Sequence, residues 1–176
     1  MGYAGGSKAN PTYRDLGDHS ETIQIDYDPA QISYQELLDV FWRSHSPTAR
    51  PWSRQYASII FYHNQEQRRL AEASRDREAT RRGSPIYTEM VPFAEFYLAE
   101  AYHQKYQLQQ VPALLREFRA LYPRDEEFID STAAARVNGY LGGYGTPAAL
   151  QADIEDLGLS LAAQQKLLDL VSGGSP

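Results

Sequence analysis

Glu21 is the residue of this sequence best placed to act as an acid. It stands at the start of a run in which Ile23, Ile25 and Tyr27 alternate with polar residues, and this period of two predicts a strand with one buried face. A carboxylate at the mouth of such a strand can be held rigidly beside a pocket and transfer a proton there. A glutamate at a strand start is also commonly a solvated surface charge, and the neighbouring residues leave both interpretations open.

The other residue types that carry chemistry are unevenly represented. The sequence contains no cysteine, which removes disulfides, thiolate metal sites and any cysteine nucleophile. Thirteen tyrosines accompany six phenylalanines; they could line a polar-tipped pocket or pack at the edge of a core. No pair of histidines has the spacing of two ligands on one helix turn, so no metal site is predicted from the histidines: His19, His45, His63 and His103.

Composition narrows the class of protein. The chain has 176 residues, of which 42% are hydrophobic, enough for one domain with an appendage. Its net charge of −6 disfavours nucleic-acid binding, which needs a basic surface. It contains neither an apolar run of membrane length nor the pattern of a signal peptide, which predicts a soluble, cytoplasmic protein with no membrane partner.

The elements that must position Glu21 follow it in alternation. Ser33 caps an amphipathic helix, residues 55–62 read as a second strand, Asn64 caps an exposed helix over 65–82, and residues 84–92 read as a third strand. Strands alternating with helices predict an α/β or α+β sandwich, with a mixed sheet and flanking helices, over residues 1–107. We expect its core to contain Ile23, Ile25, Leu37, Leu38, Phe41, Ile59, Phe61 and Ile86.

The two ends of this core are less regular. Three glycines among the first six residues predict a turn or a flexible tail, and residues 96–106 read as an irregular segment leading into a short helix. Residues 108–176 read as a C-terminal helical appendage, with Thr146 and Ser160 as helix caps. A glycine-rich loop at 138–145 interrupts it, and this loop lacks the lysine that ends a phosphate-binding loop.

Taken in order, the motifs of the first part of the chain resemble those of the A-type peptide methionine sulfoxide reductases. The resemblance covers residues 2 to about 106, and the helical appendage is similar to an extension found in one branch of that family. The motifs are Gly2-Tyr3-Ala4-Gly5-Gly6, Asn10-Pro11-Thr12-Tyr13, His19-Ser20-Glu21, Tyr27-Asp28-Pro29, Phe41-Trp42 with His45, Gln55-Tyr56, Thr88-Glu89, and Ala99-Glu100 with Tyr102-His103-Gln104.

The resemblance implies an activity and a set of site residues. The activity is peptide-methionine (S)-S-oxide reductase, which acts on oxidised methionine, free or in proteins, with a thioredoxin-type reductant and without a cofactor. By resemblance Glu21 is the catalytic acid, and Tyr13 and Tyr56 bind the substrate. Two local departures stand near them. Asp18 replaces the glycine common before the histidine, which is expected to place a charge beside Glu21 and oppose its ionisation, and residues 51–54 lack a carboxylate that the family commonly has there.

The largest departure is the missing nucleophile. The family's cysteine lies in a Gly-Cys-Phe-Trp motif upstream of the Gly-Tyr-Ala-Gly-Gly motif, and neither the motif nor any cysteine is present. Sulfoxide reduction removes an oxygen atom with two electrons, so the attacking residue must itself be oxidised and then restored by a thiol. General acid catalysis increases a reaction rate by about 10²–10⁴-fold. It accelerates a nucleophilic step but cannot replace the nucleophile. The polypeptide as written is therefore predicted to be inactive.

Three hypotheses remain open. In the first, the start at Met1 is misplaced and the nucleotides before it encode, in frame, about 30 further residues containing Gly-Cys-Phe-Trp. In the second, the chain is a non-catalytic relative that binds methionine sulfoxide or a partner protein. In the third, it performs unrelated chemistry, for example at a metal site. Because a strand of the resembled fold is missing, we also expect an exposed apolar flank, with marginal stability or self-association.

Overall fold

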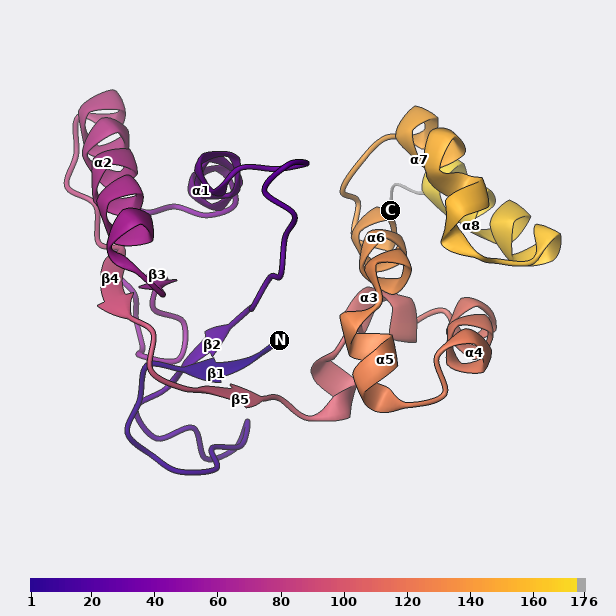
Figure 1. Cartoon of the computed structure of the whole chain (residues 1–176), viewed down its shortest axis with the longest axis horizontal. Helices are drawn as coiled ribbons and strands as arrows, with labels where there is room; N and C mark the ends of the chain where they lie inside the picture. Colours follow the sequence, from indigo (N-terminus) through magenta and orange to yellow (C-terminus); the bar gives the residue numbers. More distant parts are fainter. Residues whose placement is uncertain (174–176) are drawn as a thin grey trace. The chain divides into compact units, whose positions relative to one another are not determined.

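The computed structural model describes residues 1–173 and divides into two compact units. Unit 1 spans Met1–Glu100, and unit 2 begins at Ala101. Figure 1 shows the strands in unit 1 and a group of helices in unit 2. The combination of small sheets with many helices confirms the α+β class, including a helical C-terminal region.

The first sheet of unit 1 is built around the N-terminal strand. β1 (Gly2–Ala4) lies between β2 (Ser20–Thr22) and β5 (Phe96–Leu98), antiparallel to both. Tyr3, opposite Glu21 on one side and Tyr97 on the other, is fully buried. The prediction of a turn or flexible tail at the N-terminus is therefore wrong, because pairing on both edges orders a segment that its glycines alone would leave mobile. Residues 96–98, expected to be irregular, supply one of those edges.

The second sheet is a parallel pair joined by a helix. β3 (Ile59–Tyr62) pairs with β4 (Glu89–Pro92), with Ile59 opposite Glu89, and α2 (Gln65–Arg82) connects them. The predicted strand-helix-strand order is thus confirmed, and the α2 bounds are those expected from the Asn64 cap. The Asn64 side chain accepts from the Gln67 N–H at 2.9 Å, which satisfies one otherwise unpaired donor of the first helical turn.

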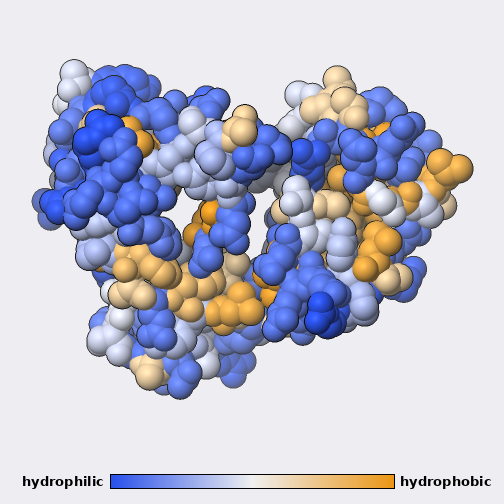
Figure 2. Space-filling model, in the orientation of Figure 1, coloured by the Kyte–Doolittle hydropathy of each residue, from blue (hydrophilic) through white to orange (hydrophobic). Residues whose placement is uncertain are grey.

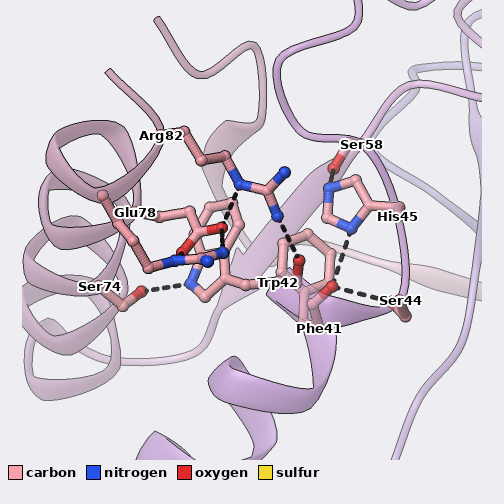
Figure 3. A network of polar contacts seen from close by, with 9 residues as sticks. Phe41, Trp42, Ser44, His45, Ser58, Ser74, Glu78 and Arg82 are labelled. Atoms are coloured by element: carbon pink, nitrogen blue, oxygen red, sulfur yellow. Dashed lines mark hydrogen bonds and ion pairs between the residues drawn. The ribbon is translucent and has the colours of Figure 1, made fainter. Parts of the chain in front are cut away.

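Helix α1 (Tyr34–Arg43) packs on α2 through apolar side chains and through a network of hydrogen bonds between them. The Trp42 indole donates to Ser74 Oγ at 3.0 Å, and Ser74 donates to the Ala71 carbonyl at 2.7 Å. Glu78 accepts from Arg81 at 2.6 Å and from Arg82, which also donates to the Trp42 carbonyl at 3.2 Å. Figure 3 shows Ser74, Glu78 and Arg82 of α2 grouped around Trp42. The indole N–H and the Glu78 carboxylate are buried, and both have hydrogen-bond partners, as buried polar groups require.

Part of the predicted core is wrong. Ile23 and Ile25 are 68% and 52% exposed, because β2 ends at Thr22 and none of the described strands pairs with the segment that follows. An alternating pattern buries one face only when a neighbour covers it. Leu38 is buried as predicted. The other five predicted core residues are half-buried, and Trp42, Ile60 and Ala71 join Leu38 at the centre of this cluster: Leu37, Phe41, Ile59, Phe61 and Ile86.

Unit 2 is helical. Its core is lined by residues from most of its helices, including Phe118 and Phe128, both fully buried. The predicted loop at 138–145 begins later than expected, because residues 138–141 form the last turn of a helix. The helices are η1 (Ala101–His103), α3 (Tyr106–Gln109), α4 (Pro112–Leu121), α5 (Asp125–Asp130), α6 (Thr132–Leu141), α7 (Pro147–Asp153), η2 (Ile154–Leu157) and α8 (Leu161–Gly173).

The caps predicted for unit 2 are present. The Thr146 side chain accepts from the Ala149 N–H at 3.1 Å at the start of α7, and the Ser160 side chain accepts from the Ala163 N–H at 3.3 Å at the start of α8. Glu117 of α4 in turn accepts from the Ser160 N–H and hydroxyl at 2.9 and 2.6 Å. The residue that caps α8 therefore also connects this helix to α4 by hydrogen bonds. Within residues 1–173, no helix is both long and apolar enough to cross a membrane.

Glu78 gives the α1–α2 contact a defined pH dependence. Hydrogen bonds from Arg81 and then Arg82 lower the pKa of Glu78 from 4.5 to about 2, although burial opposes this. The stabilisation is present above the ordinary pKa and is lost as the pH falls through about 2. We predict that Glu78→Gln lowers the free energy of unfolding by about 1–3 kcal/mol at pH 7, since the side chain is 8% exposed and both arginines lose a charged partner. Urea unfolding should show this difference shrinking toward pH 2.

Glu72→Gln is the matched control, because Glu72 pairs with Arg68 on the exposed side of α2 with 40% of its side chain accessible. Its effect should stay below about 0.5 kcal/mol at every pH. Equal effects of the two substitutions would show that the Glu78 network does not stabilise the contact.

Candidate functional site

Glu21 is held by two neighbouring segments. Its strand pairs with β1, and its N–H donates to the Gln55 carbonyl at 2.9 Å. The Gln55 side-chain amide donates to Glu21 Oε1 at 2.7 Å, and the glutamate is half-buried. A strand residue with hydrogen bonds to both main chain and side chain has little rotational freedom. The carboxyl group is therefore fixed in place, as expected for a residue at the mouth of a strand.

Tyr56 and Tyr13 lie next to this carboxyl group. The Gln55 amide donates to the Tyr56 hydroxyl at 3.2 Å. A side-chain hydrogen bond with Tyr13 is the largest cause that raises the pKa of Tyr56, and the negative charge of Glu21 contributes to the same direction. Tyr13 is 40% exposed and Tyr56 is 44% exposed, so a molecule from solvent can reach both side chains. The structure thus brings together all three residues that the resemblance singled out.

Glu100 fixes the segment that carries Tyr13. Its Oε1 accepts from the Tyr13 N–H at 3.0 Å, and its Oε2 accepts from the Tyr3 hydroxyl at 2.6 Å. Tyr3 is buried in the central strand β1, so the carboxylate connects the Tyr13 loop to the middle of the sheet. No role for Glu100 is predicted from the sequence; its place in the Ala99-Glu100 motif is the signal that could have pointed to it.

His19 is a structural residue and not a ligand. It is 1% exposed, its Nδ1 accepts from the Gly6 N–H at 3.2 Å, and its Nε2 donates to the Lys8 carbonyl at 2.8 Å. These partners define one neutral tautomer and tie down the loop after β1. A Cβ on Gly6 would lie 2.6 Å from the His19 ring, so the close approach requires glycine.

Asp18 acts on the same loop. Its carboxylate accepts from the Ser7 N–H at 2.8 and 2.9 Å and from the Ser7 hydroxyl at 3.0 Å, and the Lys8 N–H lies at 3.3 Å. These bonds, the Ser7 N–H first, lower the pKa of Asp18 to about 2. The Asp18 carboxylate therefore fixes the main chain of residues 7 and 8.

A cavity of about 590 Å³ opens beside the carboxyl group of Glu21. Glu21 and Tyr56 are among its lining residues, and much of the rest is apolar, including Leu38, Phe41 and Ile60. Figure 2 shows the surface of unit 1 hollowed between the helix layer and the strands, with apolar residues near the opening. An apolar pocket with a few polar groups converging at one side is the usual form of a small-molecule site.

Two polar side chains of the cavity wall bear on its chemistry. The Tyr34 hydroxyl is buried without a hydrogen-bond partner among the described residues, and burial raises the pKa of Tyr34. His45 donates from Nδ1 to the Phe41 carbonyl at 2.8 Å, and its Nε2 accepts from Ser58 Oγ at 2.8 Å. Figure 3 shows His45 between Phe41 and Ser58. Both imidazole nitrogens are occupied by these bonds, and residues 1–173 contain no group of histidine and carboxylate side chains arranged to hold a metal ion.

The loop before Tyr56 differs from the resembled pattern. Trp52 is 82% exposed, with its ring centroid 4.9 Å from that of Tyr56, so it flanks the tyrosine and does not cover the cavity. Arg54 donates to both carboxylate oxygens of Glu89 at 2.7 and 2.8 Å. This loop is therefore joined to β4 by an ion pair. In the resembled pattern, a pocket carboxylate is common in the same region.

Comparison with known proteins places the chain in a family. The model of the peptide methionine sulfoxide reductase family matches residues 1–136, and the model of the helical domain of selenoprotein methionine sulfoxide reductase A matches residues 123–171. Since the first match covers most of the chain, the protein belongs to the peptide methionine sulfoxide reductase family.

Individual relatives agree. The chain is 46% identical over 167 residues to a peptide methionine sulfoxide reductase of Drosophila melanogaster, covering 94% of this chain and 67% of the relative. It is 44% identical over 146 residues to peptide methionine sulfoxide reductase A5 of Oryza sativa subsp. japonica, covering 80% and 57%, and 43% identical over 145 residues to that of Arabidopsis thaliana, covering 79% and 56%. The chain therefore spans only a little over half the length of the two plant relatives and about two thirds of the fly protein.

Removing the Glu100 carboxylate should loosen the Tyr13 loop. We predict that Glu100→Ala lowers the free energy of unfolding by about 1–3 kcal/mol, because it removes the carboxylate that accepts from both the buried Tyr3 hydroxyl and the Tyr13 N–H. Amide hydrogen exchange of residues 12–15 should become faster in the same variant. Glu95→Ala is the control: Glu95 is exposed and accepts from the Tyr97 hydroxyl at 2.6 Å, and its removal should cost less than about 0.5 kcal/mol. An undisturbed loop in Glu100→Ala would contradict the role given to Glu100.

Proposed function

We propose that unit 1 binds the sulfoxide group of oxidised methionine, free or in proteins, as the substrate-binding part of a peptide-methionine (S)-S-oxide reductase. The observation that carries the proposal is a cluster at the apolar cavity, in which the Gln55 amide joins Glu21 to Tyr56 and Tyr56 is hydrogen-bonded to Tyr13. The sulfoxide oxygen is a strong hydrogen-bond acceptor, and neutral carboxyl and phenol groups are donors that match it. The methyl and methylene groups of the substrate then contact the apolar wall.

Reduction itself needs a residue that this sequence does not supply. In the family's reaction a thiolate attacks the sulfoxide sulfur, the oxygen leaves the substrate as its thioether forms, and the cysteine becomes a sulfenic acid. Two further thiols return it to the thiolate with release of water. Glu21 would serve as the acid that protonates or hydrogen-bonds the oxygen. Because the sequence contains no cysteine, this polypeptide alone binds the sulfoxide and does not reduce it. A thioredoxin-type protein is the reductant that we propose for a form that does contain the nucleophile.

The binding prediction can be tested on the chain as it stands. Titration with N-acetyl-methionine S-sulfoxide should shift the NMR signals of Tyr13 and Tyr56 in a saturable manner, and Tyr13→Phe or Tyr56→Phe should each weaken the affinity about threefold to tenfold, the usual loss for one hydrogen bond. Tyr144→Phe is the matched control, since Tyr144 is 76% exposed in unit 2. With dithiothreitol present, no methionine should form above the level of a heat-denatured control.

Two outcomes separate the hypotheses. Adding a synthetic peptide with the Gly-Cys-Phe-Trp motif should produce thiol-dependent reduction if the site lacks only its nucleophile, whereas saturable binding without such rescue supports a non-catalytic sulfoxide-binding relative. If the S-sulfoxide causes no saturable shift, the proposed binding is refuted under either hypothesis. Turnover by the chain alone would refute the claim that reduction requires a cysteine.

We further propose that the protein self-associates through the extended segment after β2. Ile23 and Ile25, two positions apart, are both exposed. Among the described residues, β3 has a neighbouring strand on one edge only. Pairing of the segment after β2 with the other edge of β3 in a second copy would cover the isoleucines and give that edge hydrogen-bond partners. Light scattering coupled to size-exclusion chromatography should show a dimer or larger species that Ile23→Thr with Ile25→Thr dissociates. Leu161→Thr, at a residue 84% exposed in unit 2, should leave it unchanged; a monomer at all concentrations would refute the proposal.

A further inference from the structure

Gln55 contacts Glu21 through both its main chain and its side chain. Its carbonyl accepts from the Glu21 N–H at 2.9 Å, and its Nε2 donates to Glu21 Oε1 at 2.7 Å. The same Nε2 lies 3.2 Å from the Tyr56 hydroxyl oxygen. A primary amide carries two N–H donors, so one side chain provides a separate hydrogen for each of these oxygens.

The backbone that carries Gln55 is itself anchored. The Ala57 N–H donates to the Arg54 carbonyl at 3.1 Å, closing a turn with Gln55 and Tyr56 at its centre. The Ser20 hydroxyl donates to the same Arg54 carbonyl at 2.6 Å, and the Arg54 guanidinium is paired with Glu89. The position of the amide is therefore set by β2 on one side and β4 on the other.

Donation to a single carboxylate oxygen has a consequence for proton transfer. When Glu21 is neutral, the oxygen that accepts from the amide is the carbonyl oxygen, so the proton is carried by Oε2. The Tyr56 oxygen likewise accepts from Gln55, so the Tyr56 hydrogen is directed to another acceptor. The hydrogen bond with Tyr13 that raises the pKa of Tyr56 is consistent with Tyr56 as the donor in that pair.

We propose that Gln55 is a positioning residue of this site. It determines which carboxyl oxygen of Glu21 carries the proton when Glu21 is neutral, and it orients the Tyr56 hydroxyl toward Tyr13, so that these polar groups are arranged before a sulfoxide arrives. The inference rests on the proposed function for its ligand. Gln55 acts through Glu21 and Tyr56 and does not itself contact the sulfoxide.

A double-mutant cycle distinguishes positioning from general support of the fold. Gln55→Met keeps the length of the side chain and removes both donors, and should weaken binding of N-acetyl-methionine S-sulfoxide about threefold to tenfold. In a Glu21→Met background the same substitution should cost less affinity than in the wild type, because one of the two acceptors through which Gln55 acts is gone and only Tyr56 remains. Gln151→Met, at an exposed glutamine of unit 2, is the control and should leave the affinity unchanged.

The outcomes do not depend on catalysis. Equal losses of affinity in both backgrounds, accompanied by a lower melting temperature, would show a structural role and overturn the inference. The side-chain amide NMR signals of Gln55 provide a second measurement without ligand: they should move upfield in Glu21→Met and not in Gln151→Met. If the wild-type chain binds no sulfoxide, the proposed function fails, and this amide shift alone then decides the inference. Unchanged Gln55 signals in Glu21→Met overturn it.

Discussion

The arrangement of unit 1 depends on the burial of Tyr3 in the middle of a three-stranded sheet. Its strand supplies the hydrogen-bonding edge for β2, which carries Glu21, and for β5, which leads to Glu100. The Tyr3 hydroxyl in turn orients the Glu100 carboxylate, and that carboxylate holds the main chain at Tyr13. A buried phenol needs a partner for its hydroxyl, and here the partner that satisfies it also fixes a residue of the candidate site.

A second constraint comes from the chemistry of sulfur. The site offers hydrogen-bond donors and an apolar wall, the two features on which the proposal of sulfoxide binding rests. They are not sufficient for its reduction, because no side chain of the chain can accept the oxygen atom and be restored by a thiol. The proposed function therefore assigns binding to Gln55, Glu21 and the two tyrosines, and leaves the redox step to a residue that this sequence does not contain.

The many charged residues around the site mainly serve structure. Asp18 is held by the backbone of residues 7 and 8, Arg54 by Glu89, and Glu78 by two arginines. In each case the carboxylate has partners that satisfy it, as burial or loop closure demands. His19 and His45 follow the same rule, since both nitrogens of each ring have hydrogen-bond partners. Residue types that suggest metal binding or acid–base chemistry in a sequence are thus used here to fix loops and helix contacts.

The sequence by itself determined the α+β class, the bounds of α2, the helix caps and the identity of the candidate site residues, because capping, helical periodicity and local motifs are properties of neighbouring residues. The tertiary structure decided what depends on distant partners. Gly2–Ala4 is a central strand only because two later segments pair with it, and Ile23 and Ile25 are exposed because no described strand covers them. Likewise, the role of Gln55 was not visible in the motif, since its amide reaches Glu21 across 34 positions of sequence, and only folding brings the two side chains within hydrogen-bonding distance.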